Sequence, residues 1–327
     1  MACQSCFNTL LSFSDLCHRE RDLISFLQDH LVLPGTVACP KCKKDCYLAR
    51  EDTRLRFRCQ RQVKVPKTRK TKKCPFSVTA KKGTFFEGSH LDVPTVCRFV
   101  ACWLMVHYPK KRFIMEELQV SSRTFVDWSS LCREVCMDYL TRRSVLLGGE
   151  GVTVEIDEAK IGKRKCNRGR RIEGQWIFGG YERGSGNVFI VPVPDRTTDT
   201  LLELIREHIR PGTTIISDCL RFYQCLGTEG FRHLTVNHNL TFVDPDTGAH
   251  TQNIERLWRD VRGGIPRYGR KEAHMSGYLA EFLFKRAVPR THLIHEFMRA
   301  AADLYPPSPV PIGEDPEEPV AGPSSAP

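Results

Sequence analysis

Apolar residues recur at helical spacing in two stretches of the chain. The first lies within residues 1–36 and ends at Pro34-Gly35, a pair that breaks helices. The second covers residues 91–143, where the pattern predicts three helices: Val93–Tyr108, Phe113–Gln119 and Arg123–Arg142. The short turn before the last helix, with Ser121 or Ser122 as its N-cap, favours a helix-turn-helix, and a plain helical linker fits almost as well.

Residues 150–305 carry a different pattern, in which short apolar runs alternate with helical stretches. The runs predict strands at Val152–Ile156, Gln175–Tyr181, Val188–Val193, Thr213–Ser217 and Leu234–Val236. The helical stretches are Thr198–His208, Leu220–Leu226, Thr251–Arg262 and Ala273–Arg286. Three strands followed by alternating helices and strands are typical of an α/β domain of the ribonuclease H-like type.

One helical stretch, HTQNIERLWRDVR from His250 to Arg262, has a sharply divided pattern. Its apolar residues fall on one face of a helix: Ile254, Leu257, Trp258 and Val261. Glu255 lies near the first turn and projects away from that face. The pattern therefore predicts a packed helix that presents one carboxylate.

Two aspartates follow predicted strands: Asp157 ends the run VTVEID and Asp218 ends TTIISD. Each is expected at the carboxyl end of its strand. A single acid in such a place often only caps a turn, but clustered acids repel one another unless a cation neutralises them. Two Mg²⁺ or Mn²⁺ ions, roughly 3.5–4 Å apart and held by oxygen ligands, can stabilise both the attacking and the leaving oxygen of phosphoryl transfer. Asp157, Asp218 and Glu255 are the predicted catalytic and metal-binding residues.

Three polar residues flank these acids in the sequence: His238, His250 and Asn253. A histidine in a loop is most often exposed or structural. Here His238 follows a predicted strand, and His250 and Asn253 lie next to Glu255. We therefore expect all three to support the acids or to contact DNA.

A basic stretch begins three residues after Asp157 and runs from position 160 to 171. Seven of its twelve residues are Lys or Arg: Lys160, Lys163, Arg164, Lys165, Arg168, Arg170 and Arg171. Such a run can be a solvated loop or a nuclear-import signal. Its position favours binding of phosphates, and Arg262, Arg267 and Arg270 would extend the same surface.

Cysteines in residues 37–90 have the spacing of a zinc ribbon. Cys39-Pro-Lys-Cys42 is a knuckle in which two thiolates can reach one tetrahedral ion, and Cys59 and Cys74 are the predicted return pair. Cys46 is a spare candidate, and a loop with unrelated thiols is the alternative. Near the start of the chain, Cys3, Cys6 and Cys17-His18 could also bind zinc, but small buried thiols are the simpler interpretation.

Composition narrows the class of partner. The 327 residues carry a net charge of +11, and the tail after Tyr305 has four acids and no Lys or Arg, which leaves about +15 on the remainder. This favours a polyanion. The 15 cysteines, with no signal peptide or membrane span expected, indicate metal ligands and buried thiols in a reducing compartment.

These patterns divide the chain into five segments. They are an N-terminal helical segment at 1–36, a zinc ribbon at 37–90, a helix-turn-helix-like domain at 91–149, a ribonuclease H-like catalytic domain at 150–305, and a disordered Pro-rich acidic tail at 306–327.

Three motifs, IDEAKIGK, IISDCLRFYQCL and VNHNLTFVDPDTGAHTQNIERLWRDVR, resemble the Merlin superfamily of cut-and-paste DNA transposases and their bacterial insertion-sequence relatives. The resemblance runs from about Asp15 to Leu304. It implies that Asp157, Asp218 and Glu255 form a DDE triad binding two Mg²⁺ or Mn²⁺ ions. A family lysine seven positions past the glutamate is Arg262 here, and the usual second CxxC is replaced by Cys59 and Cys74 on either side of a basic insert.

The resemblance implies a nuclear, two-metal DNA transposase that cleaves and joins strands at terminal inverted repeats. The zinc ribbon and the helix-turn-helix would recognise the double-stranded ends, and a homodimer or higher oligomer would hold two ends together. The alternative is a transposase-derived host DNA-binding protein that acts in transcription or chromatin without catalysis. A ribonuclease H-like nuclease that cuts but never joins is a third hypothesis.

Overall fold

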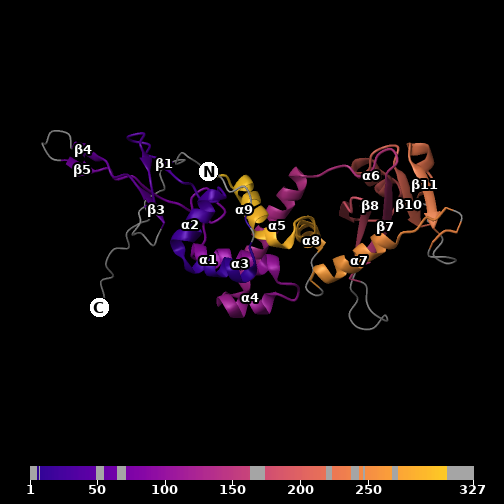
Figure 1. Cartoon of the computed structure of the whole chain (residues 1–327), viewed down its shortest axis with the longest axis horizontal. Coiled ribbons are helices and arrows are strands. Elements are labelled where there is room, and N and C mark those ends of the chain that lie inside the picture. Colours follow the sequence, from indigo (N-terminus) through magenta and orange to yellow (C-terminus); the bar gives the residue numbers. More distant parts are fainter. Residues whose placement is uncertain are drawn as a thin grey trace, which may run out of the picture. The chain divides into compact units, whose positions relative to one another are not determined.

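The computed structural model describes residues 6, 8–48, 55–64, 71–162, 174–218, 223–236, 243–245, 247–266 and 272–307. Figure 1 labels their helices and strands. The chain forms two compact units. The first comprises Met1–Ala101 and Ile294–Pro327, and the second comprises Cys102–Leu293. The segment boundary predicted near residue 150 therefore lies inside the second unit.

The first unit joins the two ends of the chain around small strands and helices. Its helices are α1 (Leu10–His18), α2 (Glu20–Asp29), most of α3 (Val93–Met105) and nearly all of α9 (Leu293–Leu304). Thr9 caps α1, since its hydroxyl accepts from the Ser12 amide at 3.1 Å. Phe85 packs edge-on against Phe297, so α9 contributes to the core of this unit.

Three two-stranded antiparallel pairs make up the cysteine-containing part of this unit. They are β1 (Val37–Ala38) with β2 (Asp45–Cys46), β3 (Arg56–Arg58) with β6 (Ser77–Thr79), and β4 (Gln62–Lys64) with β5 (Thr71–Lys73). Such short pairs bury little apolar surface and are marginal alone. Their stability therefore depends on additional links.

The helical part of the second unit contains α4 (Lys111–Leu118) and α5 (Ser122–Arg142). Ser121 is the N-cap of α5, and its hydroxyl accepts from the Thr124 amide at 3.1 Å. Phe125, Trp128 and Val135 are buried on the inner face of α5. The predicted helices and turn are present, and recognition of DNA by them stays a prediction.

A five-stranded mixed sheet forms the rest of the second unit (Figure 1). Its strands are β7 (Thr153–Ile161), β8 (Gln175–Glu182), β9 (Val188–Val193), β10 (Thr214–Asp218) and β11 (Arg232–Val236). They lie in the order β11-β10-β7-β8-β9. β7, β8 and β9 are antiparallel neighbours, whereas β10 is parallel to both β7 and β11. This order and these directions are those of the predicted ribonuclease H-like fold.

Helices cover both faces of the sheet. Leu201 and Ile205 of α6 (Thr198–His208) pack on one face with Val154 and Ile156 of β7. On the other face, the apolar side of α7 (Gln252–Gly264) and α8 (Met275–Ala287) packs on Ala159 and Ile161. Successive strand residues point to opposite faces, so β7 serves both layers.

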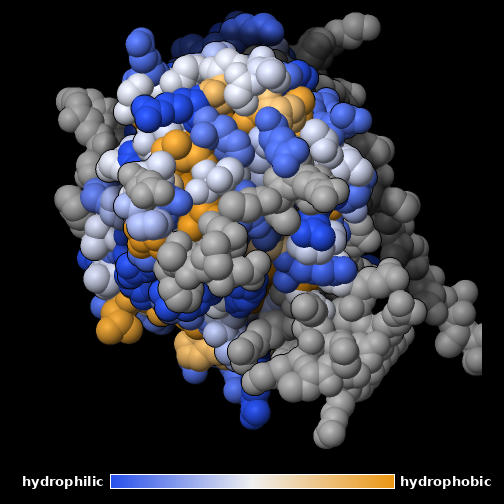
Figure 2. Space-filling view, turned by 90° about the vertical axis from the view of Figure 1, so that its right-hand side faces the viewer, coloured by the Kyte–Doolittle hydropathy of each residue, from blue (hydrophilic) through white to orange (hydrophobic). Residues whose placement is uncertain are grey.

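Two predicted elements differ from the structure. β7 continues four residues past Asp157, because β8 pairs with it as far as Ile161. Of the helix predicted at Leu220–Leu226, residues 220–222 lie outside the described residues, and a short 3-10 helix, η2 (Leu226–Glu229), precedes β11. Within the described part of the chain, none of the helices has the length and hydrophobicity to span a bilayer. Hydrophilic residues cover most of the coloured surface in Figure 2.

Candidate functional site

Asp157 and Asp218 lie on adjacent parallel strands. The register of β7 and β10 pairs Glu155 with Ile216, and the two aspartates each come two residues later. Because side chains alternate along a strand, both project to the same face, and neighbouring strands lie about 4.8 Å apart. The strand order therefore brings together two acids separated by 61 positions in the sequence.

The prediction that Asp157 ends its strand is wrong. Asp157 is the middle residue of β7, paired with Gly179 of β8. The parallel pairing of β7 with β10 runs as far as Glu155 and Ile216, whereas the antiparallel pairing of β7 with β8 continues to Ile161. Ala159 and Ile161 are buried, which extends the apolar alternation beyond the acid.

Glu255 lies in the first turn of α7, whose inner face is buried as predicted: Ile254, Leu257, Trp258 and Val261. The Glu255 side chain is exposed and accepts a hydrogen bond from the Thr251 hydroxyl at 3.1 Å. Packing of the apolar face against β7 and β8 fixes the helix over the sheet. The carboxylate thus projects from a rigid element.

A fourth acid, Glu155, anchors the start of α7. It is fully buried on β7, and its Oε2 accepts from the backbone amides of Asn253 and Ile254 at 2.9 and 3.1 Å. The Asn253 side chain donates to Oε1 at 2.7 Å, and Arg183 Nε donates to the same oxygen at 2.7 Å. A carboxylate at a helix N-terminus is favourable because the free amides and the helix dipole both attract it.

This anchor determines where two predicted flanking residues lie. The Asn253 side chain faces Glu155, and His250 Nδ1 lies 3.6 Å from Glu155 Oε1. The His250 carbonyl accepts from Arg183 at 2.7 Å. Both residues therefore support the helix that carries Glu255. Sequence reasoning missed Glu155 and Arg183, although a lone acid between Val154 and Ile156 in an apolar strand is an unusual signal.

Trp258 positions Asp157 from the opposite side. Its indole Nε1 donates to Asp157 Oδ2 at 2.9 Å. The ring lies over Gly179, where an added Cβ would be 2.7 Å from the Trp258 ring. Only glycine leaves this space free, so β8 contributes to the site without a functional group.

Burial and mutual repulsion raise the pKa values of two neighbouring acids. Burial, opposed by the Trp258 hydrogen bond and reinforced by the charges of Asp218 and Glu255, raises the pKa of Asp157 to about 6. Burial and the charges of Asp157 and Asp218 raise the pKa of Glu158 to about 8. Glu158 points to the α6 face, where the Tyr223 hydroxyl donates to it and Arg196 lies 3.9 Å away.

The three acids are close enough for Asp218 and Glu255 to act electrostatically on Asp157. Asp157, Asp218 and Glu255 do not form a tight group in the described part of the chain. Their donor atoms are not all within 4.8 Å of one another. Asp157, Asp218 and Glu255 offer only oxygen donors, the ligands that Mg²⁺ and Mn²⁺ prefer. A divalent cation would relieve the repulsion that raises the pKa of Asp157, so the donor set fits the predicted ions.

Most of the predicted phosphate-binding residues lie outside the described residues. These are Lys163, Arg164, Lys165, Arg168, Arg170, Arg171, Arg267, Arg270 and also His238. Lys160 is described on β7, with its Nζ 5.3 Å from the centre of the Trp176 ring. Arg262 lies in the last turn of α7 and lines a cavity with Lys111 and Arg133.

The structure brings the four predicted zinc cysteines together. Cys39 Sγ lies 3.8 Å from Cys74 Sγ, and Cys42 Sγ lies 3.4 Å from Cys59 Sγ. A hydrogen bond from the Lys44 amide lowers the pKa of Cys42 to about 7, which favours the thiolate form that binds metal. Cys46 is buried nearby and donates weakly to the Lys44 carbonyl at 3.9 Å.

Comparison with known proteins bears on the α/β domain. Residues 146–287 match the family described as the ISXO2-like transposase domain. An uncharacterized transposase-like protein of Haemophilus influenzae is 28% identical over 95 residues, which are 29% of this chain and 76% of that protein. Both matches support a resemblance to DDE transposases, while membership of the Merlin superfamily stays a prediction.

Similar solved structures include two retroviral integrase domains. The catalytic core domain of BIV integrase has a TM-score of 0.24 and 16% identity, covering 46% of this chain and 82% of that chain. The catalytic core domain of HTLV-2 integrase in complex with magnesium has a TM-score of 0.24 and 14% identity, covering 48% and 86%. The order and directions of the five strands are the evidence for the ribonuclease H-like fold.

Proposed function

We propose that this protein is a metal-dependent DNA transposase that cleaves DNA at terminal inverted repeats and joins the freed strand to target DNA. The observation that carries the proposal is the arrangement of three acids: Asp157 and Asp218 on adjacent parallel strands, and Glu255 on a helix fixed above them. The match of residues 146–287 to a transposase domain supports it.

Asp157, Asp218 and Glu255 would hold two Mg²⁺ or Mn²⁺ ions. When bound, these ions supply charge stabilisation for the attacking and leaving oxygens of phosphoryl transfer. The chain's own contribution is positioning. Trp258 orients one carboxylate oxygen of Asp157, and Glu155 fixes the first turn of α7 beneath Glu255. Rigid placement matters because phosphoryl transfer needs aligned reactants more than covalent help from the protein.

The parts around this site would bind double-stranded DNA. The basic stretch at 160–171 and Arg262 would grip phosphates, each neutralised phosphate adding roughly 0.9 to the slope of log affinity against log salt. Cys39, Cys42, Cys59 and Cys74 would bind one structural zinc ion, and this ribbon and α4–α5 would recognise the inverted repeats. Two ends require at least a dimer, and a DNA substrate in the nucleus is expected.

The test is a cleavage and strand-transfer assay on the terminal inverted repeats, using the full chain with Mn²⁺. Wild type is compared with Glu255→Gln and Asp157→Asn, and Asp260→Asn is the matched control because Asp260 is exposed on the same helix as Glu255. Wild type and the control should cut and join, whereas both site variants should bind DNA but not cut.

The other hypotheses give different results in the same assay. Specific binding without cutting by wild type in any divalent metal would favour a host-recruited DNA-binding protein. Cutting without joining would favour a nuclease. Full activity of Asp157→Asn would show that the acids are not the site.

A further inference from the structure

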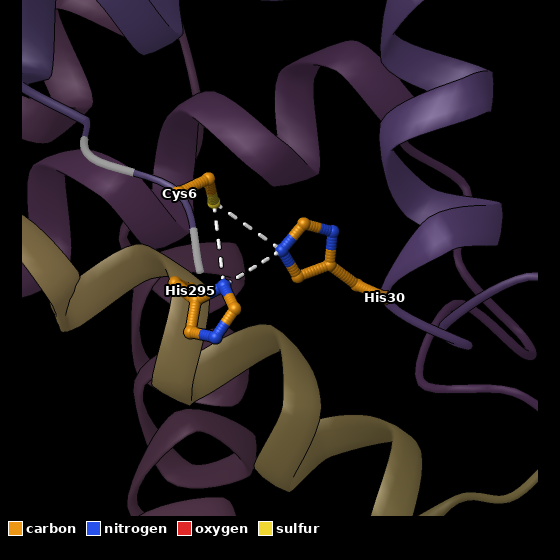
Figure 3. A group of neighbouring side chains, drawn as sticks. All are labelled: Cys6, His30 and His295. Atoms are coloured by element: carbon orange, nitrogen blue, oxygen red, sulfur yellow. Dashed lines mark hydrogen bonds between the residues drawn. The ribbon is translucent and has the colours of Figure 1, made fainter. Parts of the chain in front are cut away.

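The first unit contains a second group of metal-ligating side chains, separate from the four cysteines. Cys6 lies in the N-terminal segment, His30 follows the last residue of α2, and His295 lies on α9 (Figure 3). Cys6 Sγ is 3.4 Å from His30 Nε2 and 3.3 Å from His295 Nδ1, and the two nitrogens are 3.0 Å apart. We propose that these three side chains bind a zinc ion that ties the N-terminal segment and α2 to α9.

The three donor atoms have nearly the spacing of one face of a tetrahedron around zinc. Zn–N bonds of about 2.0–2.1 Å and a Zn–S bond of about 2.3 Å at tetrahedral angles place the donors about 3.3–3.6 Å apart. The observed edges of 3.0–3.4 Å need only a small expansion to meet those distances. Thiolate and imidazole are also the donors that zinc prefers.

The hydrogen bonds behind the histidines aim their lone pairs inward. His30 Nδ1 lies 2.7 Å from the Phe26 carbonyl oxygen, which can only accept, so Nδ1 carries the proton and Nε2 presents a lone pair to the cluster. His295 Nε2 lies 3.7 Å from a Glu296 carboxylate oxygen, on the side of the ring away from the cluster. Metal-ligating histidines are oriented in this way by a carbonyl or carboxylate on the outer nitrogen.

Burial makes the cluster costly to leave without an ion. His30 is 3% exposed and His295 is 2% exposed, and the Phe26 ring stacks against His30 with centroids 3.9 Å apart. Polar side chains buried among aromatic rings stabilise a fold only when their donors and acceptors are matched. A zinc ion would be bound by all three inward-facing atoms together, and Asn8 Nδ2, which donates to Cys6 Sγ at 3.3 Å, would support the sulfur from outside the site.

The position of the site in the chain indicates a structural role. His30 and His295 are 265 positions apart, and Cys6 and His295 are 289 apart. One ion would therefore close a link between nearly opposite ends of the sequence within the first unit.

The first test is the zinc content of the purified full chain, measured by mass spectrometry after removal of loosely bound metal. Wild type should hold about two ions per chain, and Cys6→Ser and His295→Gln should each hold about one, the ribbon ion. Cys17→Ser is the matched control, because Cys17 is a buried thiol of α1 in the same unit, and it should keep the wild-type content. Wild-type zinc content in both site variants would overturn the proposal.

A second measurement on wild type does not depend on whether the variants fold. X-ray absorption at the zinc edge should detect imidazole nitrogen beside sulfur, because the four ribbon ligands are all cysteines and imidazole can come only from a different site. A first shell of sulfur alone would overturn the proposal and leave the cluster as a hydrogen-bonded triad.

Discussion

Buried carboxylates at two places in the second unit have pKa values shifted in opposite directions. Glu281 of α8 is buried, which by itself raises its pKa, but three cations outweigh burial and lower the pKa to about 2. Those cations are Lys110, Lys285 at 2.9 Å and Arg133 at 3.3 Å. On the sheet, burial and neighbouring acids instead raise the pKa of Asp157 to about 6 and that of Glu158 to about 8.

The difference lies in whether neighbouring cations outweigh the cost of burying each carboxylate, as they do for Glu281 and do not for Asp157 and Glu158. Glu281 has its countercharges within the fold, so it holds α8 to α5 and to the residues before α4. Arg196 lies 3.9 Å from Glu158 and lowers the pKa of that acid, but it does not outweigh burial and the neighbouring acids. Under the proposed function, a divalent cation from solution would offset the remaining repulsion among these acids.

The largest expected effect comes from replacing one buried glutamate of each kind by glutamine. Glu281→Gln leaves Lys110, which is fully buried, without its countercharge and should cost about 3–5 kcal/mol of unfolding free energy. Glu158→Gln replaces a side chain that is mostly protonated in the folded chain at pH 7 but ionised in the unfolded chain, so this substitution should raise the unfolding free energy and not lower it. Urea denaturation of the metal-free chain measures both. Equal losses of unfolding free energy in the two variants would contradict the difference between Glu281 and the sheet acids.

A divalent metal ion should stabilise the folded chain by binding at the acids of the sheet and not at Glu281. At a free Mn²⁺ concentration near 100 times its dissociation constant, wild type should gain about 2.7 kcal/mol. Asp157→Asn should lose this gain, and Asp260→Asn should keep it because Asp260 is exposed elsewhere on α7. Thermal unfolding with and without Mn²⁺ is the measurement. A gain of the same size in Asp157→Asn would place the ion elsewhere.

The two groups should also respond to pH with opposite signs. The pKa values of Asp157 and Glu158 are raised in the folded chain, so metal-free stability should fall as pH rises from about 5 to about 8. The pKa of Glu281 is lowered to about 2, so its contribution is lost as pH falls from about 4.5 towards about 2. Glu158→Gln should reduce the loss of unfolding free energy between about pH 5 and about pH 8 by about 2 kcal/mol. Thermal unfolding from about pH 3 to about pH 8.5 measures this dependence. The same fall of stability at high pH in wild type and Glu158→Gln would contradict the prediction.

The smallest effect is expected from one hydrogen bond. Trp258→Phe removes the donor to Asp157 Oδ2 while keeping the ring, and should reduce cleavage about 10-fold, the size typical of residues that orient a metal ligand. That hydrogen bond lowers the pKa of Asp157, so the acidic limb of the activity profile should move to higher pH. Trp128→Phe on α5 is the control for loss of an indole. Identical profiles for both variants would argue against a positioning role.

Local patterns predicted most of the secondary structure because each element carries its own signals. α6 begins and ends at the predicted residues, Thr198 and His208, since Thr197 caps an amphipathic segment. The inner face of α7 was likewise visible in the spacing of its apolar residues. The order of elements likewise predicted that Asp157 and Asp218 lie on neighbouring strands and Glu255 on a helix packed against them, while the role of these acids stays a prediction.

What the sequence did not reveal depends on contacts between distant residues. Glu155 is separated by 28 positions from Arg183 and by 98 from Asn253, so no local pattern identifies it as the anchor of α7. The extension of β7 beyond Asp157 depends on pairing with β8, although buried Ala159 and Ile161 were a usable sign. His30 and His295 meet across 265 positions, which spacing rules cannot detect.

Under the proposed function, a substitution at Gly179 alone would be enough to inactivate the protein. A methyl group at this position would lie 2.7 Å from the Trp258 ring, so Gly179→Ala displaces the indole while every acid remains in the gene. A related sequence that retains Asp157, Asp218 and Glu255 can therefore be inactive. A judgement of activity from sequence should include Gly179 beside the three acids.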